Sequence, residues 1–153
     1  MRVRVLVLPA VCLVVAVKLM AAEKAAPAKA TPAEAQALLD KAVSAIETQG
    51  ELKALAAFND PKGGFRDREL YVFCLGPDGK ITASVDPKMI GTDETAVKGP
   101  DGREIGKEIA TVGSQGGGSL EYQWKNPVSG KVETKVSYIK RAGAQTCGVG
   151  AYK

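Results

Sequence analysis

The hydrophobic pattern of this chain changes its period once, and that change limits the folds that the chain can adopt. Up to residue 58 the apolar residues recur at helical spacing, and Leu39, Ala42, Val43 and Ile46 lie on one stripe with Leu38. After the Asn, Asp, Pro and Gly residues of 59–64, the apolar residues come in short β-rich runs separated by turns. An order of helix, two strands, a loop with a helix, and three strands predicts an α+β domain.

The first helix has a well-marked beginning and end. Thr31 is suited to cap it, Pro32 suits its first position, and Glu34 completes a capping box. Gly50 is the expected end. A second short helix is expected at 51–58, and a third at 103–114, where Ile105, Ile109 and Val112 share one face.

Five segments are expected to be strands of one antiparallel sheet, with the first helix packed against a face of it. The first two should form a hairpin around the Gly-Pro-Asp-Gly turn at 76–79. A loop at 86–102 is too long for a plain connection, and such loops are often functional. The five expected strands are 70–75, 80–85, 120–124, 132–141 and 146–152.

The first 22 residues are typical of a secretory signal peptide. Two arginines precede an apolar run of about a dozen residues, and small residues follow it. The sequence therefore predicts a periplasmic or secreted protein with a signal peptide at 1–22, a linker at 23–30 and one domain at 31–153. An uncleaved N-terminal anchor is the alternative interpretation, although the run is shorter than the ~20 residues that span a bilayer.

The net charge depends strongly on that first segment. The whole chain carries 21 basic and 17 acidic residues, a formal charge of +4. Arg2, Arg4 and Lys18 account for three of the basic residues, so the remainder of the chain is close to neutral. Because nucleic-acid binding calls for a clustered basic face, a nucleic-acid partner is not expected.

The chain contains no histidine. This excludes histidine-ligated zinc, Ser-His-Asp hydrolysis and a Cys-His dyad, and it removes the usual general base near neutral pH. We therefore expect no catalytic residues, no metal and no cofactor, and a protein that is not an enzyme.

Two cysteines, Cys74 and Cys147, lie in the first and last expected strands. If those strands are neighbours, the thiols could face each other. An exported protein is in an oxidising compartment, so a structural disulfide, two buried free thiols and a redox pair are all open. The spacing has no Cys-x-x-Cys pattern, which argues against redox chemistry.

Aromatic and polar residues gather on the third and fourth expected strands: Tyr122, Trp124, Lys135, Ser137 and Tyr138. Residues two apart on a strand share a face, so Tyr122 and Trp124 should point the same way, and Tyr138 should point away from Ser137 unless a bulge intervenes. Such a face could hold a small organic anion. Alternatively, the rings belong to the core and Lys135 extends its amine to solvent.

Seven segments, in this order, resemble the single Cache domain family, and in particular small exported proteins that consist of this domain alone. The resemblance covers about residues 31–153. The segments are 69–73 (Glu-Leu-Tyr-Val-Phe), 76–79 (Gly-Pro-Asp-Gly), 86–91 (Asp-Pro-Lys-Met-Ile-Gly), 98–103 (Lys-Gly-Pro-Asp-Gly-Arg), 122–127 (Tyr-Gln-Trp-Lys-Asn-Pro), 135–138 (Lys-Val-Ser-Tyr) and 148–152 (Gly-Val-Gly-Ala-Tyr).

The resemblance implies a PAS-like fold, with a long N-terminal helix on a curved five-stranded antiparallel sheet. It also implies extracytoplasmic sensing of a small molecule, often a short carboxylate, in a pocket between the sheet and the long loop. Carried over by position, the ligand-binding residues would be Tyr71, Trp124, Lys135 and Tyr138. Relatives often carry histidine where this chain has Ser84.

The expected function is therefore that of a non-catalytic sensory module that acts with a separate membrane receptor or kinase in signal transduction. Two other functions remain open. The first is a periplasmic thiol-disulfide protein that uses Cys74 and Cys147, and the second is a structural or interaction protein of the envelope.

Overall fold

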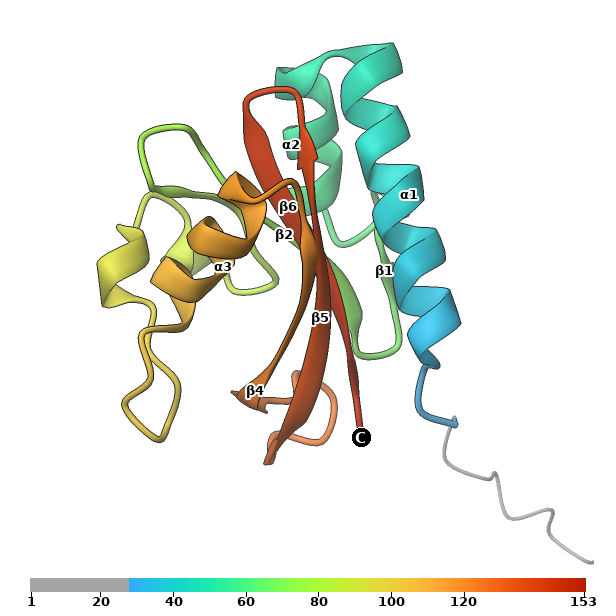
Figure 1. Cartoon of the computed structure of the whole chain (residues 1–153). Helices are drawn as coiled ribbons and strands as arrows, with labels where there is room; N and C mark the ends of the chain where they lie inside the picture. Colours follow the sequence, from blue (N-terminus) through green and yellow to red (C-terminus); the bar gives the residue numbers. More distant parts are fainter. Residues whose placement is uncertain (1–27) are drawn as a thin grey trace, which may run out of the picture.

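The computed structural model describes residues 28–153, which form three layers (Figure 1). A central sheet carries two helices, α1 and α2, on one face, which we call the helix face. A third helix, α3, and residues 86–104 cover the other side, which we call the pocket face. The expected signal peptide at 1–22 and residues 23–27 of the expected linker lie outside the described residues.

The helices begin and end close to where the sequence predicts. α1 (Pro32–Gln49) starts at the expected capping box, in which the Thr31 hydroxyl accepts a hydrogen bond from the Glu34 N–H and the Glu34 carboxylate accepts one from the Thr31 N–H. Gly50 ends this helix with a φ of 85°, a conformation that favours glycine. α2 (Glu51–Asn59) and α3 (Ile105–Ser114) complete the set.

The sheet is antiparallel throughout, as expected, and its strands are ordered β1-β2-β6-β5-β4, with β3 also paired to β2. The five predicted strands are present, and a two-residue strand is added ahead of them. The bounds are β1 (Arg66–Asp67), β2 (Leu70–Leu75), β3 (Ile81–Ala83), β4 (Gly118–Lys125), β5 (Val132–Ala142) and β6 (Gln145–Tyr152).

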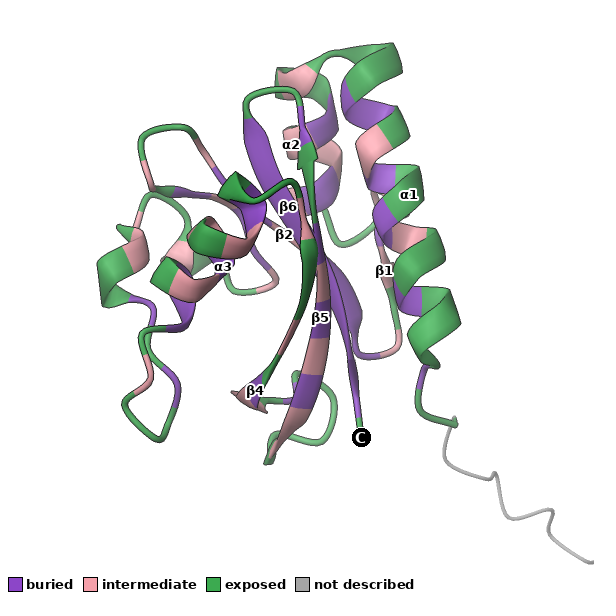
Figure 2. Cartoon of the chain, in the orientation of Figure 1, coloured by how far each residue is buried: buried purple, intermediate pink, exposed green. Residues whose placement is uncertain are grey.

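Strands β2 and β6 lie at the centre of the molecule and are buried on both faces (Figure 2). On β2 the side chains of Leu70, Val72 and Cys74 pack against the helices, whereas Phe73 and Leu75 belong to a second cluster beneath α3. The two faces of the sheet therefore contribute to two separate hydrophobic clusters. This is why the sequence of β2 is an unbroken apolar run rather than an alternating one.

Two segments differ from the expectation. The second expected strand, 80–85, is shortened to Ile81–Ala83, because the chain turns at 84–86 to enter the long loop. That loop contains two short 3₁₀ helices, η1 (Pro87–Met89) and η2 (Glu94–Ala96), and packs against α3. The long connection is thus an ordered wall on the pocket face.

The last residues of the expected linker pack against the domain. Ala30 is buried, and its N–H donates a hydrogen bond to the buried Glu69 carboxylate at 2.6 Å. Lys29 pairs with Glu133 and also donates to the carbonyl of Lys153. Within residues 28–153, no helix is both long and apolar enough to cross a bilayer.

Candidate functional site

A cavity of about 270 Å³ lies on the pocket face of the sheet. Strands β2, β4 and β5 form its base, and the long loop and α3 form its opposite wall. Its lining is mostly hydrophobic, and the apolar residues include Phe73, Leu75, Ile81, Met89, Val97, Ile105 and Ile109. We refer to this cavity as the pocket. Its volume lies just below the range of pockets that hold drug-sized ligands, roughly 300–1,000 Å³, so it suits a small molecule.

Two glycines of β6 make room at the base of the pocket. A Cβ atom on Gly150 would lie 2.3 Å from Cε of Lys135 and 2.4 Å from Oγ of Ser137. A Cβ atom on Gly148 would lie 2.3 Å from the Phe73 ring. Both distances are far shorter than real contacts, so the side chains of the neighbouring strands can lie flat across β6 only because these positions are glycine.

Lys135 extends across Gly150 from β5 to β2. Its side chain is only 1% exposed, and its Nζ donates a hydrogen bond of 2.9 Å to the phenol oxygen of Tyr71. The same Nζ lies 4.1 Å from the centre of the Tyr71 ring, 5.2 Å from that of Phe73 and 5.4 Å from that of Tyr152. The alternative in which this amine reaches solvent is therefore wrong.

The charge of Lys135 has no acidic counterpart among residues 28–153. None of the ion pairs in this part of the chain, each defined by an N–O distance of 4.0 Å or less, includes it. Burial disfavours the ammonium form and lowers the pKa of Lys135 from 10.5 to about 7. Burial also raises the pKa of Tyr71 well above 10, with the neighbouring Tyr152 adding to the effect, so this phenol stays neutral.

The aromatic residues of β4 lie beside this amine. Tyr122 and Trp124 point to the same face, as predicted, and their rings meet edge to face with centres 5.9 Å apart. The Tyr122 hydroxyl forms a hydrogen bond of 2.9 Å with the Ser137 hydroxyl, and both groups are buried. Of the four ligand-binding residues carried over from the family, Tyr71, Trp124 and Lys135 all line the pocket.

Tyr138 requires a correction, because it does not line the pocket. Strand β5 pairs with β4 and β6 without a bulge at this point, so its side chains alternate regularly. Ser137 and Ile139 face the pocket side, whereas Tyr138 packs against the hydrophobic cluster beneath the helices. The alternation of the strand thus excludes Tyr138 from a site that contains Lys135.

Sequence reasoning missed several residues of the pocket. Phe73 and Tyr152 approach the buried amine, and Ile105 and Ile109 of α3 line the opposite wall. In 148–152, glycine alternates with larger residues. This pattern was the available sign that side chains from neighbouring strands lie across this strand. The contribution of α3 had no comparable signal.

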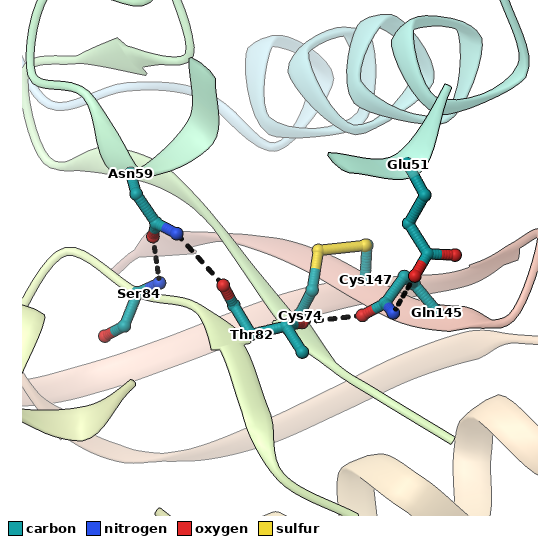
Figure 3. The surroundings of a disulfide bond; sticks show 7 residues. All are labelled: Glu51, Asn59, Cys74, Thr82, Ser84, Gln145 and Cys147. Atoms are coloured by element: carbon teal, nitrogen blue, oxygen red, sulfur yellow. Dashed lines mark hydrogen bonds between the residues drawn. A yellow bond between two sulfur atoms is a disulfide. The ribbon is translucent and has the colours of Figure 1, made fainter. Parts of the chain in front are cut away.

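Ser84 is buried and lines the pocket. Its N–H donates to the side-chain oxygen of Asn59 (Figure 3). Its hydroxyl accepts from the N–H of Asp86. Its hydroxyl is therefore engaged in holding the start of the long loop.

The cysteines form a disulfide between neighbouring residues of β2 and β6 (Figure 3). Cys74 and Cys147 are almost completely buried and belong to the hydrophobic cluster on the helix face. Beside them, the Thr82 hydroxyl donates to the Gln145 side chain, which in turn donates to Glu51. This buried position favours a structural role for the bridge over thiol exchange. Among residues 28–153 there is also no group of three or more acidic, cysteine or histidine side chains placed to hold a metal ion.

Several solved structures share this fold. A methyl-accepting chemotaxis protein from Vibrio parahaemolyticus RIMD 2210633 matches with a TM-score of 0.67 and 18% identity, over 78% of this chain and 86% of that one. A periplasmic sensor domain of a chemotaxis protein matches with a TM-score of 0.59 and 20% identity, over 78% and 88%.

A third structure is a Cache chemosensory domain described in terms of carboxylic acid recognition. It matches with a TM-score of 0.56 and 22% identity, over 78% of this chain and 86% of that one. A comparison with curated proteins finds no match. Residues 11–150, nearly the whole sequence, match the family described as Single Cache domain 2. The chain therefore belongs to the single Cache domain family, as the order of its sequence segments predicts.

Proposed function

We propose that this protein is a non-catalytic extracytoplasmic sensory module that binds a short monocarboxylate in the pocket. The observation that carries the proposal is the buried amine of Lys135, which lines a mostly apolar cavity and has no acidic partner within residues 28–153. A buried charge is costly unless it is paired, and a ligand carboxylate would supply the missing partner.

The size and lining of the pocket support a small, partly apolar acid. A cavity of about 270 Å³ is small for a ligand pocket, and the wall formed by Val97, Ile105 and Ile109 suits a short hydrocarbon tail. One buried cation pairs with one carboxylate. A second carboxylate would have to lose its hydration against an apolar wall.

The proposed partner and location are supported by analogy with the relatives. The solved structures that share the fold include parts of chemotaxis proteins, one of them a periplasmic sensor domain. We therefore propose that this chain acts outside the cytoplasm and reports its ligand to a separate membrane receptor or kinase.

Calorimetric titration of the purified protein with acetate, propionate, butyrate and succinate tests the proposal. Propionate or butyrate should bind, and the Lys135→Met variant, which keeps the chain length without the charge, should lose affinity by about 30-fold or more. Lys140→Met is the matched control, since this exposed lysine of the same strand pairs with Asp40 on the helix face and should leave the affinity unchanged. If none of the acids binds wild type, or if both variants bind like wild type, the proposal is wrong.

A further inference from the structure

We propose that Lys135 is also a covalent capture site for small carbonyl compounds, in particular short aliphatic aldehydes, which it binds as an imine. A buried primary amine that lines a small apolar cavity, without an acidic partner in the described part of the chain, provides the geometry for this reaction. The proposal uses the same pocket as carboxylate binding but does not depend on it.

The surroundings of the amine favour its uncharged form. Tyr71 and Phe73 from β2, Tyr152 from β6 and Tyr122 from β4 surround it or line the same cavity, and these groups are neutral. Asp86 also lines the pocket but lies beyond ion-pair distance of Nζ. Because no carboxylate lies close enough to offset the cost of burying the ammonium, a substantial fraction of Lys135 is the free amine at neutral pH, and only the free amine is a nucleophile.

The pocket also holds the amine in place for the reaction. The hydrogen bond between Nζ and the Tyr71 phenol, together with the contact of the lysine chain with Gly150, fixes the end of a side chain that is otherwise flexible. An aldehyde with a short hydrocarbon chain carries no charge into the apolar cavity, so its entry costs less desolvation than that of a charged ligand.

The reaction balances without an oxidant or a reductant. The lone pair of Nζ attacks the carbonyl carbon, the π electrons move to the oxygen, and one proton of the amine transfers to that oxygen to give a carbinolamine. Loss of the hydroxyl group with the second amine proton releases water and leaves a neutral C=N bond. The product carries no charge in the cavity, and hydrolysis reverses the reaction.

Reductive trapping of wild-type protein tests the inference. Propanal and sodium cyanoborohydride are added at pH 7, and the adducts are located by peptide mass spectrometry. Lys135 should acquire one propyl group at least about tenfold faster than the average exposed lysine, because at pH 7 an ordinary lysine is almost entirely protonated. Exposed residues such as Lys53 and Lys62 are internal references in the same sample.

Two additional measurements assign the adduct to the pocket. Lys135→Met should lose the fast adduct, whereas Lys140→Met should keep it. If propionate also binds as proposed above, an excess of it should slow the labelling of Lys135 but not that of the exposed lysines. The inference is overturned if the exposed lysines are labelled while Lys135 is not, or if Lys135 reacts no faster than they do. Calorimetry measures carboxylate binding without any covalent step. If the trapping fails, the proposed carboxylate binding is therefore unaffected. If carboxylate binding fails, the proposed reaction with aldehydes is likewise unaffected.

Discussion

Lys135 is the residue on which the chemistry of this protein depends. Its amine is enclosed by aromatic rings and one phenol oxygen, and these favour a cation less strongly than a carboxylate would. Burial consequently lowers its pKa to about 7, which places its change of charge within the physiological range. A carboxylate that enters the pocket must therefore bring a proton with it whenever the amine is uncharged.

Carboxylate affinity should consequently depend on pH. The anion binds the ammonium form, so affinity should be nearly constant between pH 6 and 7 and should fall about tenfold per pH unit above the pKa of about 7. Titration of propionate by calorimetry between pH 6 and 9, in buffers of different ionisation enthalpy, should show proton uptake that increases over this range. An affinity that stays constant up to pH 9 would contradict this role of Lys135.

The same residue should make the stability of the unliganded protein depend on pH. The pKa of Lys135 is about 7 in the folded chain and near 10.5 when the side chain is exposed, so between these values the unfolded chain binds a proton that the folded chain does not. The free energy of unfolding should therefore rise with pH from 7 to 9.5, by up to about 1.4 kcal/mol per unit. Denaturant unfolding of wild type and Lys135→Met checks this, since the variant should lack the increase.

At the scale of single elements, β6 determines how the pocket is shaped. Its pocket face carries Gly148 and Gly150 between larger residues, and the side chains of Phe73 and Lys135 occupy the space above them. Its helix face carries Cys147 and Val149, which belong to the hydrophobic cluster beneath the helices. One strand thus supports both layers of the molecule.

Gly150→Ala should displace Lys135. The new methyl group would overlap Cε of Lys135 and the Ser137 hydroxyl, so the amine can no longer reach Tyr71 along its present path. Propionate affinity measured by calorimetry should fall at least about tenfold, because a small misplacement of a charged partner costs more than 1.4 kcal/mol. Gly113→Ala controls for general destabilisation, because its new methyl group would crowd the side chain of Thr146 at a position outside the pocket. Equal losses in the two variants would refute the specific role of Gly150.

The disulfide should stabilise the fold without contributing to ligand binding. It joins residues 73 positions apart, and replacing both Cys74 and Cys147 with alanine should lower the free energy of unfolding by about 4 kcal/mol. Chemical denaturation with and without reductant measures this difference in wild type. Cys74 contributes to the lining of the pocket, but both cysteines belong to the cluster on the helix face, so propionate should bind the folded double variant with near wild-type affinity. A loss of binding in a variant that remains folded would show that the bridge shapes the pocket.

The elements show which parts of the fold can be predicted from sequence. The capping box of α1 and the apolar run of β2 are local signals, and both elements form where these signals predict. The strict alternation of β5 was equally readable, and it correctly separates Tyr138 from Ser137. Tyr138 was assigned to the pocket by its position in the family resemblance, and that assignment did not consider this alternation.

The burial of Lys135 could not be predicted from sequence, because it depends on residues far apart in the chain. The amine is enclosed only when β2, β5 and β6 are placed side by side and when Gly150 leaves space for the lysine chain. A lysine on a strand is ordinarily at the surface, with its amine in water. The wall formed by α3 and the long loop likewise arises from tertiary packing.

At the scale of the whole molecule, the sheet separates a pocket from a helical layer. The pocket lies between the sheet, the long loop and α3. Helices α1 and α2 lie on the other side of the sheet from α3 (Figure 1). Strands β2 and β6 contribute to the pocket on one face of the sheet and to the hydrophobic cluster beneath the helices on the other. In the function that we propose, a ligand bound to Lys135 contacts the same strands on which the long N-terminal helix packs.

The central claim is that the amine of Lys135 binds a carboxylate inside the pocket. A crystal structure of the protein with propionate tests this claim most directly. Density for propionate is expected in the pocket, with a carboxylate oxygen within about 3 Å of Nζ and the ethyl group against Val97, Ile105 or Ile109. Propionate bound elsewhere on the protein, or bound in the pocket with its carboxylate directed away from Lys135, would contradict it.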